Sequence, residues 1–456
     1  MSTQLPGTLA DRVEGRLIWP EDPDYEEARH VYNAMIEARP HVVVRCIGTD
    51  DVVAAVRYAA ETGRAVAIRG GGHSVPGFGT ADDAVVVDLS AMQAVDVDPA
   101  ARTAVAGGGT TWGRFNDATA AFGLATTGGI ISTTGIGGLT LGGGIGHLTR
   151  GYGLSCDNLL AAEVVTADGR VVTADEHQNA DLFWALRGGG GNFGVVTRFT
   201  YRLHPVDTVF AGPMFFELDD ARALLEFYRD FIPEAPREYG GFPAFHQAPP
   251  LPFIPEGRVG EPMAVAVSCW TGSQAEGERV VDRIRQVAQP VGEHVGPMPY
   301  AALNSAFDAL HPPGLQHYWK AAYVTELTDE AIAAHLEHGP RVPAVSSVMH
   351  LYPINGAAHD VAPDATAFGH RDATFAAVIA GMWPDPADNE ANTRWVKEYH
   401  AAIAPHSAPG GYTNFASADD QPKVAENYGA NYERLREVKR AWDPGNLFRL
   451  NQNIRP

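Results

Sequence analysis

The stretch Arg69-Gly70-Gly71-Gly72-His73-Ser74 follows a short alternating apolar run, Ala65-Val66-Ala67-Ile68. Three glycines after a strand let the backbone turn tightly and come within hydrogen-bond range of a ligand, because no Cβ stands in the way. His73 then projects from a loop suited to close approach. Taken alone, the pattern favours an ordinary turn with a solvated histidine. The rest of the chain reverses that interpretation.

Length and charge bound the problem first. At 456 residues the chain exceeds the ~250–300 residues that one hydrophobic core serves, so two or more lobes are predicted. The apolar content of 45% and the charged content of 20% are those of a globular protein. A net charge of -21 argues against nucleic acid or an anionic membrane as partner, because both need clustered Lys and Arg.

The pattern of cysteines and the N-terminal sequence predict no disulfide framework, metal site or targeting segment. Three widely spaced cysteines fit neither a disulfide framework nor a zinc site, and no metal is expected. The N-terminus lacks a basic start followed by an apolar run, and no segment approaches ~20 apolar residues. A soluble cytoplasmic protein is the default expectation. The oligomeric state is left open.

The order of patterns predicts an α+β fold with two lobes. Residues 1–205 are expected to form the first lobe, in subdomains of about 1–94 and 95–205. Residues 206–409 form the second, and 410–456 return to the first. Early in the chain, residues 25–38 are predicted as an amphipathic helix. Residues 422–441, rich in i to i+4 charge pairs and stopped by Pro444-Gly445, predict another near the end.

Glycine is concentrated between residues 95 and 203, and each one inside an element costs roughly 0.5–1 kcal/mol against Ala. This density suggests backbone wrapped closely around an extended anionic ligand such as a dinucleotide, held by main-chain N–H groups. A loop-rich domain with many tight turns is the alternative. The clusters are at 107–109, 128–129, 135–138, 142–146 and 188–191.

Two common nucleotide signatures fail. No G-x-x-x-x-G-K-[ST] occurs, which argues against a P-loop NTPase. One G-x-G-x-x-G is present at 189–194, but residues 195–201 after it alternate like a strand. A Rossmann fingerprint opens a helix instead. A dehydrogenase of that fold is therefore disfavoured.

The second lobe alternates strand-like runs with helices. This pattern predicts an antiparallel sheet with helices on one face, which leaves the other face free to cover a ligand. The predicted strands are 212–217, 263–270, 319–326, 347–352 and 376–383, and the predicted helices are 218–231, 275–287 and 328–338.

Several motifs in order resemble those of bacterial berberine bridge enzyme-like flavoproteins, in the vanillyl-alcohol oxidase/p-cresol methylhydroxylase superfamily. The resemblance covers nearly the whole chain and is specific for fold and FAD, not for substrate. It implies an FAD-binding lobe and a substrate lobe with an antiparallel sheet. The motifs lie at 69–74, 128–138, 141–146, 152–158, 181–195, 431–439 and 443–448.

The resemblance also implies a covalent bond from the imidazole of His73 to the 8α-methyl carbon of FAD, which needs a neutral imidazole as nucleophile. Arg69 is expected to stabilise the negative charge that the flavin gains, with a surface ion pair as its alternative role. The expected cofactor-binding residues are Arg69, Gly70, Gly71, Gly72, His73, Ser74, Gly79, Ser132, Thr133, Gly135, Gly138, Gly142, Gly143, Gly144, Gly146, Val196 and Asn451.

A second covalent link is not expected. Many relatives carry a cysteine just ahead of the G-x-G-G turn, and this chain has Ile131 there. Cys156 lies beyond the glycine cluster, and we give it little weight as a substitute.

Three side chains are the candidate catalytic residues: Lys320, His350 and Tyr412. The resemblance makes Tyr412 a candidate base, with a phenol pKa of ~10 that a cation such as Lys320 would have to lower. Alternatively no tyrosinate is needed, because a hydride can leave a neutral amine. Phe415 replaces the second aromatic of the relatives' Tyr-x-Asn-Tyr, and this puts alcohol oxidation in doubt.

Other polar and aromatic side chains have structural alternatives. Tyr352 shares a strand face with His350, so the two are expected to line a cavity together. Trp383 is predicted as core, and His370-Arg371 as a helix cap with a salt bridge. Tyr428 and Tyr432 are as compatible with core packing as with covering the ring.

These features predict an oxidase that removes a hydride from a small alcohol, amine or secondary metabolite, with O₂ as acceptor and H₂O₂ as product. A flavin dehydrogenase using another acceptor, an oxidative cyclase and a non-enzymatic flavin-binding protein stay open. Substrate identity and stereochemistry are not predicted.

Overall fold

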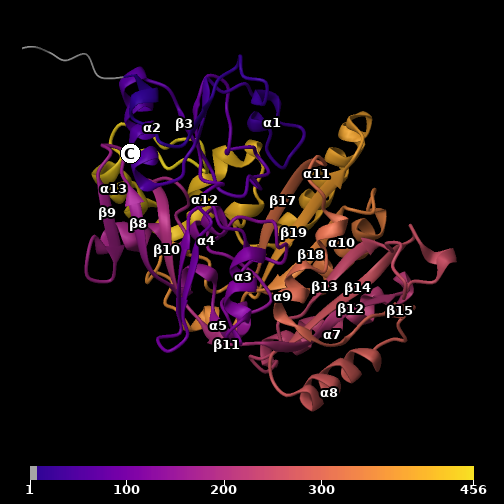
Figure 1. Cartoon of the computed structure of the whole chain (residues 1–456). Coiled ribbons are helices and arrows are strands. Elements are labelled where there is room, and N and C mark those ends of the chain that lie inside the picture. Colours follow the sequence, from indigo (N-terminus) through magenta and orange to yellow (C-terminus); the bar gives the residue numbers. More distant parts are fainter. Residues whose placement is uncertain (1–7) are drawn as a thin grey trace, which may run out of the picture.

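The computed structural model describes residues 8–456, which form two lobes side by side (Figure 1). The first lobe begins with a four-stranded sheet in the order β1-β2-β4-β3, in which β2, β3 and β4 are parallel and β1 is antiparallel. Its elements are β1 (Arg16–Ile18), α1 (Tyr25–Arg29), β2 (Val42–Arg45), α2 (Thr49–Thr62), β3 (Val66–Arg69) and β4 (Val85–Asp88).

A five-stranded antiparallel sheet, β5-β6-β10-β8-β9, completes the first lobe. Strand β10 directly follows the G-x-G-x-x-G at 189–194, so the rejection of a Rossmann fingerprint is confirmed. The elements here are β5 (Val95–Asp98), β6 (Thr103–Gly107), α3 (Trp112–Ala120), β7 (Leu124–Ala125), α4 (Ile136–Leu141), α5 (Thr149–Tyr152), β8 (Leu159–Val165), β9 (Val171–Asp175), α6 (Ala180–Leu186), β10 (Val195–Arg202) and β11 (His204–Pro205).

The second lobe is an antiparallel sheet in the order β15-β12-β14-β13-β18-β19-β17, with β16 also paired to β12. The predicted α+β class with an antiparallel sheet is confirmed. The elements are β12 (Thr208–Phe216), α7 (Ala221–Phe231), β13 (Phe242–Gln247), β14 (Pro262–Trp270), α8 (Gln274–Arg285), β15 (Gly292–Glu293), β16 (Gly296–Pro299), α9 (Tyr300–Ser305), β17 (Gln316–Val324), α10 (Asp329–His338), β18 (Val348–Pro353), β19 (Phe375–Trp383) and α11 (Asn389–Ile403).

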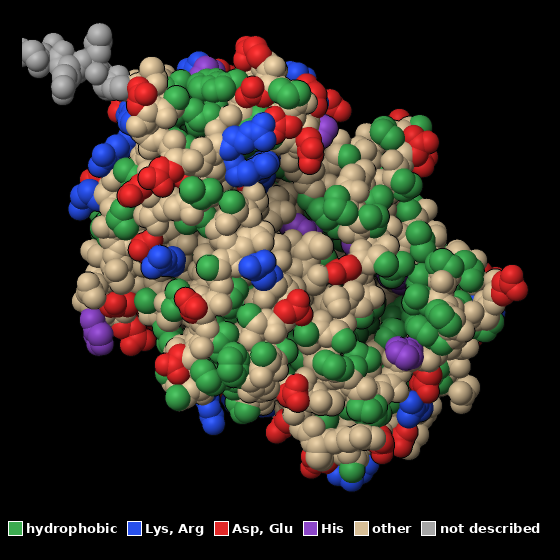
Figure 2. Space-filling model, in the orientation of Figure 1, with side chains coloured by type: hydrophobic (Ala, Val, Ile, Leu, Met, Phe, Trp, Pro, Cys, Tyr) green, Lys and Arg blue, Asp and Glu red, His purple; other side chains and the backbone are tan. Residues whose placement is uncertain are grey.

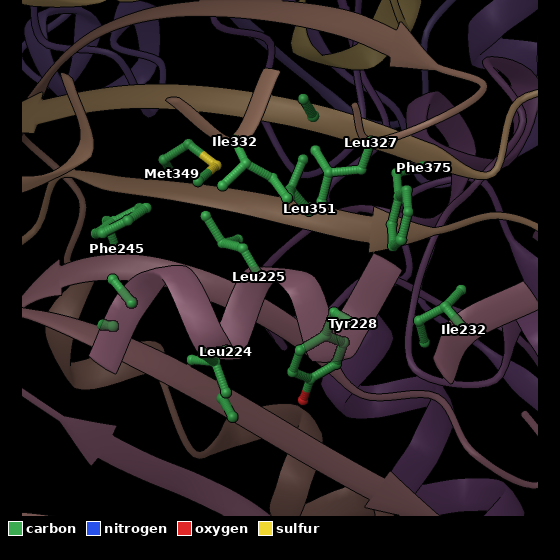
Figure 3. Packing of buried hydrophobic residues seen from close by; sticks show 14 of the residues in the cluster. Leu224, Leu225, Tyr228, Ile232, Phe245, Leu327, Ile332, Met349, Leu351 and Phe375 are labelled. Carbon is green, nitrogen blue, oxygen red and sulfur yellow. The ribbon is translucent and has the colours of Figure 1, made fainter. Parts of the chain in front are cut away.

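The two faces of this sheet have different partners, as period-two alternation requires. Phe245, Met349 and Leu351 face helices α7 and α10 in one apolar core, where Leu225 and Ile332 meet them (Figure 3). Alternate residues on the same strands pack toward the first lobe, in a second core that joins both lobes. That second face is the one available to cover a ligand.

The predicted helix at 25–38 is wrong. Helix α1 ends at Arg29, and the residues that follow are irregular, with a turn at Ala34-Met35. Tyr32 and Ala34 donate backbone hydrogen bonds to Gly72 and Leu315, at 3.1 and 2.9 Å. These bonds to distant segments replace the i to i-4 bonds that a helix would make, so tertiary contacts override the local pattern.

The predicted helix at 422–441 is broken in two. Helix α12 (Val424–Tyr428) ends at Gly429, which has φ 55°, and helix α13 (Tyr432–Trp442) starts three residues later. A glycine in the left-handed region ends a helix at little cost. No helix in residues 8–456 is both long and apolar enough to cross a membrane.

Candidate active site

Two glycine loops cross at the centre of the first lobe. A Cβ on Gly71 would clash with the backbone of Gly135, 2.8 Å from its Cα, and a Cβ on Gly135 would clash with Gly71 in return. The loop after β3 and the loop before α4 therefore pass backbone against backbone, which only glycine permits. This crossing fixes where His73 leaves the first loop.

A cavity opens beside this crossing and runs between the lobes. Figure 2 shows a hollow near the middle of the molecule with histidine atoms inside it. The predicted residues that line the cavity are Gly70, Gly71, Gly72, His73, Ser74, Gly79, Gly135, Gly138, Val196, His350 and Asn451. The structure thus brings the predicted glycine loop and the predicted second sheet together around one cavity.

The first-lobe part of the cavity has the features of a cradle. A Cβ on Gly138 or Gly191 would meet no protein atom within 4 Å, so the bare backbone at both positions faces open space. Among residues 8–456, no Lys or Arg lines the cavity. An anionic group there would therefore be held by main-chain N–H groups and neutral side-chain donors.

Unpartnered polar groups face the same space. In the described part of the chain, the backbone N–H groups of Gly71, Gly72 and His73 donate to no other protein group. Asn451 Oδ1 and Gln452 Nε2 are buried without a partner, and both residues line the cavity. Because buried polar atoms are normally paired, these donors and the acceptor fit a ligand with anionic groups and a heterocycle edge. FAD has both.

His73 is held on three sides. Its ring stacks on Tyr32 with centroids 3.8 Å apart and planes 19° apart. Thr133 Oγ1 lies 3.0 Å from Nε2 and Thr134 Oγ1 lies 3.4 Å from Nδ1. Burial, aided by nearby His311, lowers the pKa of His73 to about 4. The imidazole is therefore neutral at pH 7 and carries a lone pair on one nitrogen.

The substrate-lobe wall of the cavity carries a hydrogen-bonded pair of polar side chains. His350 Nδ1 lies 2.6 Å from the hydroxyl of Tyr352, and both side chains line the cavity from β18, as predicted from their shared face. Burial holds the pKa of His350 well below its usual range and raises that of Tyr352. Both are neutral. On the same side of the cavity lies His311, and the other lining residues there include the aromatic or aliphatic Trp319, Val348, Val378, Ala380, Met382 and Phe415.

Lys320 is not brought to the cavity. Its register partner on β19 is Ile379, in the helix-side core, whereas neighbouring Trp319 pairs with the cavity residue Ala380. Its Nζ lies 2.8 Å from Asp419 and 2.5 Å from Asp420. The period-two alternation of β17 thus turns Lys320 away from the space that the prediction assigned to it.

Tyr412 lies behind the cavity wall. Its hydroxyl accepts hydrogen bonds from the Gly144 N–H and from Asn414 Nδ2, both at 2.8 Å. Burial nevertheless raises the pKa of Tyr412. Lys320 does not offset the burial, because its Nζ pairs with Asp419 and Asp420. The geometry gives Tyr412 a role in fixing the 142–146 loop and gives no support to a tyrosinate base.

Several other predicted residues support the site from outside. Arg69 donates to the carbonyl of Ala28 at 2.6 Å and to Asp88 at 2.9 Å, so it holds the N-terminal segment. Ser132 hydrogen-bonds Asp308. Gly142, Gly143, Gly144 and Gly146 also lie off the cavity wall, packed against Asn414, Phe368, Ser155 and Gly128.

The remaining candidate residues lie either on the cavity wall or in the protein core. Cys156 is fully buried off the cavity, and burial raises the pKa of its thiol, so it is not placed to react. Ile131, in the position of the relatives' cysteine, does line the cavity. Trp383 is core, as predicted. Arg371 pairs with Asp157 through two nitrogens, at 2.8 and 2.6 Å, and strand β19, not a helix, follows His370-Arg371.

Among the cavity residues that the sequence reasoning missed are Tyr32, His311 and Trp319. Trp319 could have been found by extending the alternation that placed Lys320, because the two are adjacent on β17. No local signal marks Tyr32 or His311. They reach the cavity from segments far from any glycine motif.

Comparison with known proteins agrees with this geometry. A family profile described as FAD binding domain matches residues 40–175, and one described as berberine and berberine like matches residues 411–455. The (R)-6-hydroxynicotine oxidase of Paenarthrobacter nicotinovorans is 31% identical over 100% of this chain and 99% of its own length. The chain belongs to the berberine bridge enzyme-like family of FAD-linked oxidoreductases.

Other members of the berberine bridge enzyme-like family agree. An FAD-linked oxidoreductase of Bacillus subtilis (strain 168) is 31% identical over 98% of both chains. The crystal structure of 6-hydroxy-D-nicotine oxidase from Arthrobacter nicotinovorans has a TM-score of 0.87 at 28% identity, and covers 99% of this chain and 100% of its own. The family assignment and the glycine-lined cradle together make FAD the cofactor of this enzyme.

Proposed function

We propose that this enzyme is an oxidase that carries FAD on His73 through one covalent bond and oxidises a small, neutral, largely apolar alcohol or amine. One observation carries the proposal: a neutral imidazole lines a glycine cradle that is continuous with an apolar pocket under the second sheet. When bound, FAD supplies the hydride acceptor and then passes both electrons to O₂, which leaves as H₂O₂.

His73 suits covalent attachment. A nucleophilic imidazole must be neutral, and the lowered pKa of His73 keeps it so across the physiological range. Thr133 fixes Nε2 from one side of the ring. Ile131 supplies no second nucleophile, and Cys156 lies too deep, so a single link is expected.

His350 is the proposed proton acceptor. If Nδ1–H donates to the Tyr352 hydroxyl, Nε2 keeps its lone pair. Oxidation of an H–C–O–H or H–C–N–H group removes a hydride from carbon and a proton from the heteroatom, and His350 Nε2 takes that proton. Tyr352 then orients the ring and holds its tautomer.

The walls favour an uncharged, apolar substrate. In the described part of the chain no Asp, Glu, Lys or Arg lines the cavity, and its histidines are neutral. A carboxylate or ammonium ion would therefore be desolvated without a counter-charge. A sugar would bury several hydroxyls against Trp319, Val378 and Met382, which offer them few partners.

An anaerobic reduction experiment tests the proposal. Purified yellow protein is mixed without O₂ with aromatic alcohols, cyclic amines, and mono- and disaccharides, and the loss of flavin absorbance is followed. Bleaching by an apolar alcohol or amine, with rapid recovery in air and one H₂O₂ per turnover, supports it. Bleaching by sugars alone refutes the substrate assignment, and slow recovery in air makes the enzyme a dehydrogenase.

A further inference from the structure

The segment after α1 bridges the two lobes at His73. On one side, the Tyr32 N–H donates to Gly72 O at 3.1 Å and Asn33 Nδ2 donates to Val75 O at 2.7 Å. On the other side, the Tyr32 hydroxyl donates to the carbonyl of His311. We call residues 30–36 the bridging segment.

More bonds tie the bridging segment to the second lobe. The His317 N–H donates to Asn33 Oδ1 at 3.0 Å, and Asn33 Nδ2 donates to the His317 carbonyl at 3.1 Å. Asn33 is 3% exposed. These reciprocal bonds leave the main chain of the segment little freedom, and so they fix where the ring of Tyr32 stands.

Tyr32 holds the His73 ring across its face. A stacked aromatic ring opposes rotation of the imidazole out of its plane, while Thr133 and Thr134 restrain it in the plane. Burial raises the pKa of Tyr32 to about 12, so it remains a neutral phenol that donates to His311. Nothing else on the cavity wall stacks on His73 within the described residues.

We propose that Tyr32 is a positioning residue for covalent flavin attachment, because it fixes the His73 imidazole in the orientation from which a ring nitrogen reaches the flavin methyl carbon. This inference rests on the proposed attachment at His73. Attachment forms one N–C bond and breaks one methyl C–H bond. That hydrogen and the imidazole N–H proton end on the reduced flavin, and O₂ takes both with two electrons as H₂O₂.

Loss of orientation has a large kinetic cost, because a displacement of about 1 Å in an oriented pair lowers a rate by about 10²-fold. For Tyr32→Ala, in which the imidazole is free to rotate, we expect attachment at least about tenfold slower than in wild type. Tyr32→Phe keeps the ring and loses only the hydrogen bond to His311, so it should attach at close to the wild-type rate.

The experiment follows attachment directly. Apoprotein from flavin-depleted cells is mixed with FAD in air, and samples are denatured in acid at intervals. Flavin that stays with the protein, measured by absorbance and intact mass, gives the covalent fraction. Flavin retained before denaturation gives total binding, which separates slow attachment from failure to bind. Wild type, Tyr32→Ala, Tyr32→Leu and Tyr32→Phe are compared.

A second readout distinguishes positioning from a merely structural role. With the Tyr32 ring removed, His73 gains solvent and its pKa rises toward 6.5. Attachment in Tyr32→Ala should therefore slow further between pH 7 and 5, where wild type stays flat. Rescue by Tyr32→Phe of both the rate and the flat pH profile would support the inference.

Each outcome decides. Attachment by Tyr32→Ala at the wild-type rate overturns the inference, and so does Tyr32→Phe as slow as Tyr32→Ala. If Tyr32→Ala does not fold, Tyr32→Leu, which fills the space without a ring, takes its place under the same two criteria. If the wild-type protein binds FAD but never forms the covalent bond, the proposed attachment at His73 is wrong, and so is this inference.

Discussion

Gly138→Ala should affect the stability of the fold and the affinity for the cofactor in opposite directions. Gly138 lies within helix α4, and a Cβ there meets no protein atom within 4 Å. Alanine stabilises a helix interior by roughly 0.5–1 kcal/mol relative to glycine. The apoprotein should therefore be at least as stable as wild type. Any loss must come from the cavity into which the new methyl group points.

The expected cost falls on FAD. A methyl group inserted against a well-packed ligand costs about 1–3 kcal/mol, which is about a 5- to 150-fold weaker affinity. The comparison is made in a His73→Ala background, where FAD binds reversibly and titration gives a Kd. Gly257→Ala is the matched control, because its Cβ also meets nothing within 4 Å but lies off the cavity.

Unfolding by urea without FAD measures the stability of each apoprotein. We expect Gly138→Ala to unfold at the same or a higher urea concentration than its parent while binding FAD more weakly. Gly257→Ala should leave the Kd unchanged. Equal FAD affinity in the Gly138→Ala variant and its parent would show that the cofactor does not occupy this part of the cradle, and the reasoning from the glycines would fail.

Three further changes test the assignments around the cavity. Lys320→Met should keep the rate of flavin reduction within about twofold of wild type and lower the free energy of unfolding by about 1 kcal/mol, because Asp419 and Asp420 lose the ammonium group that they share. A variant that is stable but inactive would show that Lys320 acts in the active site. His350→Gln should slow anaerobic flavin reduction by about 10²-fold and Tyr352→Phe by about fivefold, with covalent attachment unchanged. Reduction at the wild-type rate in both variants would show that His350 is not the proton acceptor. Burial lowers the pKa of His147 to about 4, so only the unfolded state takes up its proton between pH 6.5 and 4, and the unfolding free energy falls as pH drops. His147→Phe should remove about 2 kcal/mol of the loss between pH 7 and 5 in urea titrations, and an unchanged slope would contradict this.

The glycine loop and the sheet were predictable because their signals are local. Gly71 and Gly135, within the runs at 70–72 and 135–138, mark a backbone crossing that no other residue permits, and period-two alternation on β18 predicts that His350 and Tyr352 share one face. On β17 the alternation shows only that Trp319 and Lys320 face opposite sides of the sheet, and the prediction chose Lys320 for the cavity side where the structure has Trp319.

The bridging segment was not predictable in the same way. Residues 25–38 have the apolar spacing of a helix, and nothing in their own sequence shows that Gly72, Gly314 and Leu315 will compete for their backbone groups. These bonds join positions that lie 40 or more than 270 residues apart in the chain. Tyr32, which stacks on His73, belongs to this segment.

The most direct test of this account is the mass and absorbance of wild-type protein after acid denaturation, beside His73→Ala. We predict that wild type stays yellow and carries the mass of one FAD on the peptide that contains His73, whereas His73→Ala releases its flavin entirely. Wild type that loses its colour on denaturation, or flavin that remains attached in His73→Ala, would contradict the account.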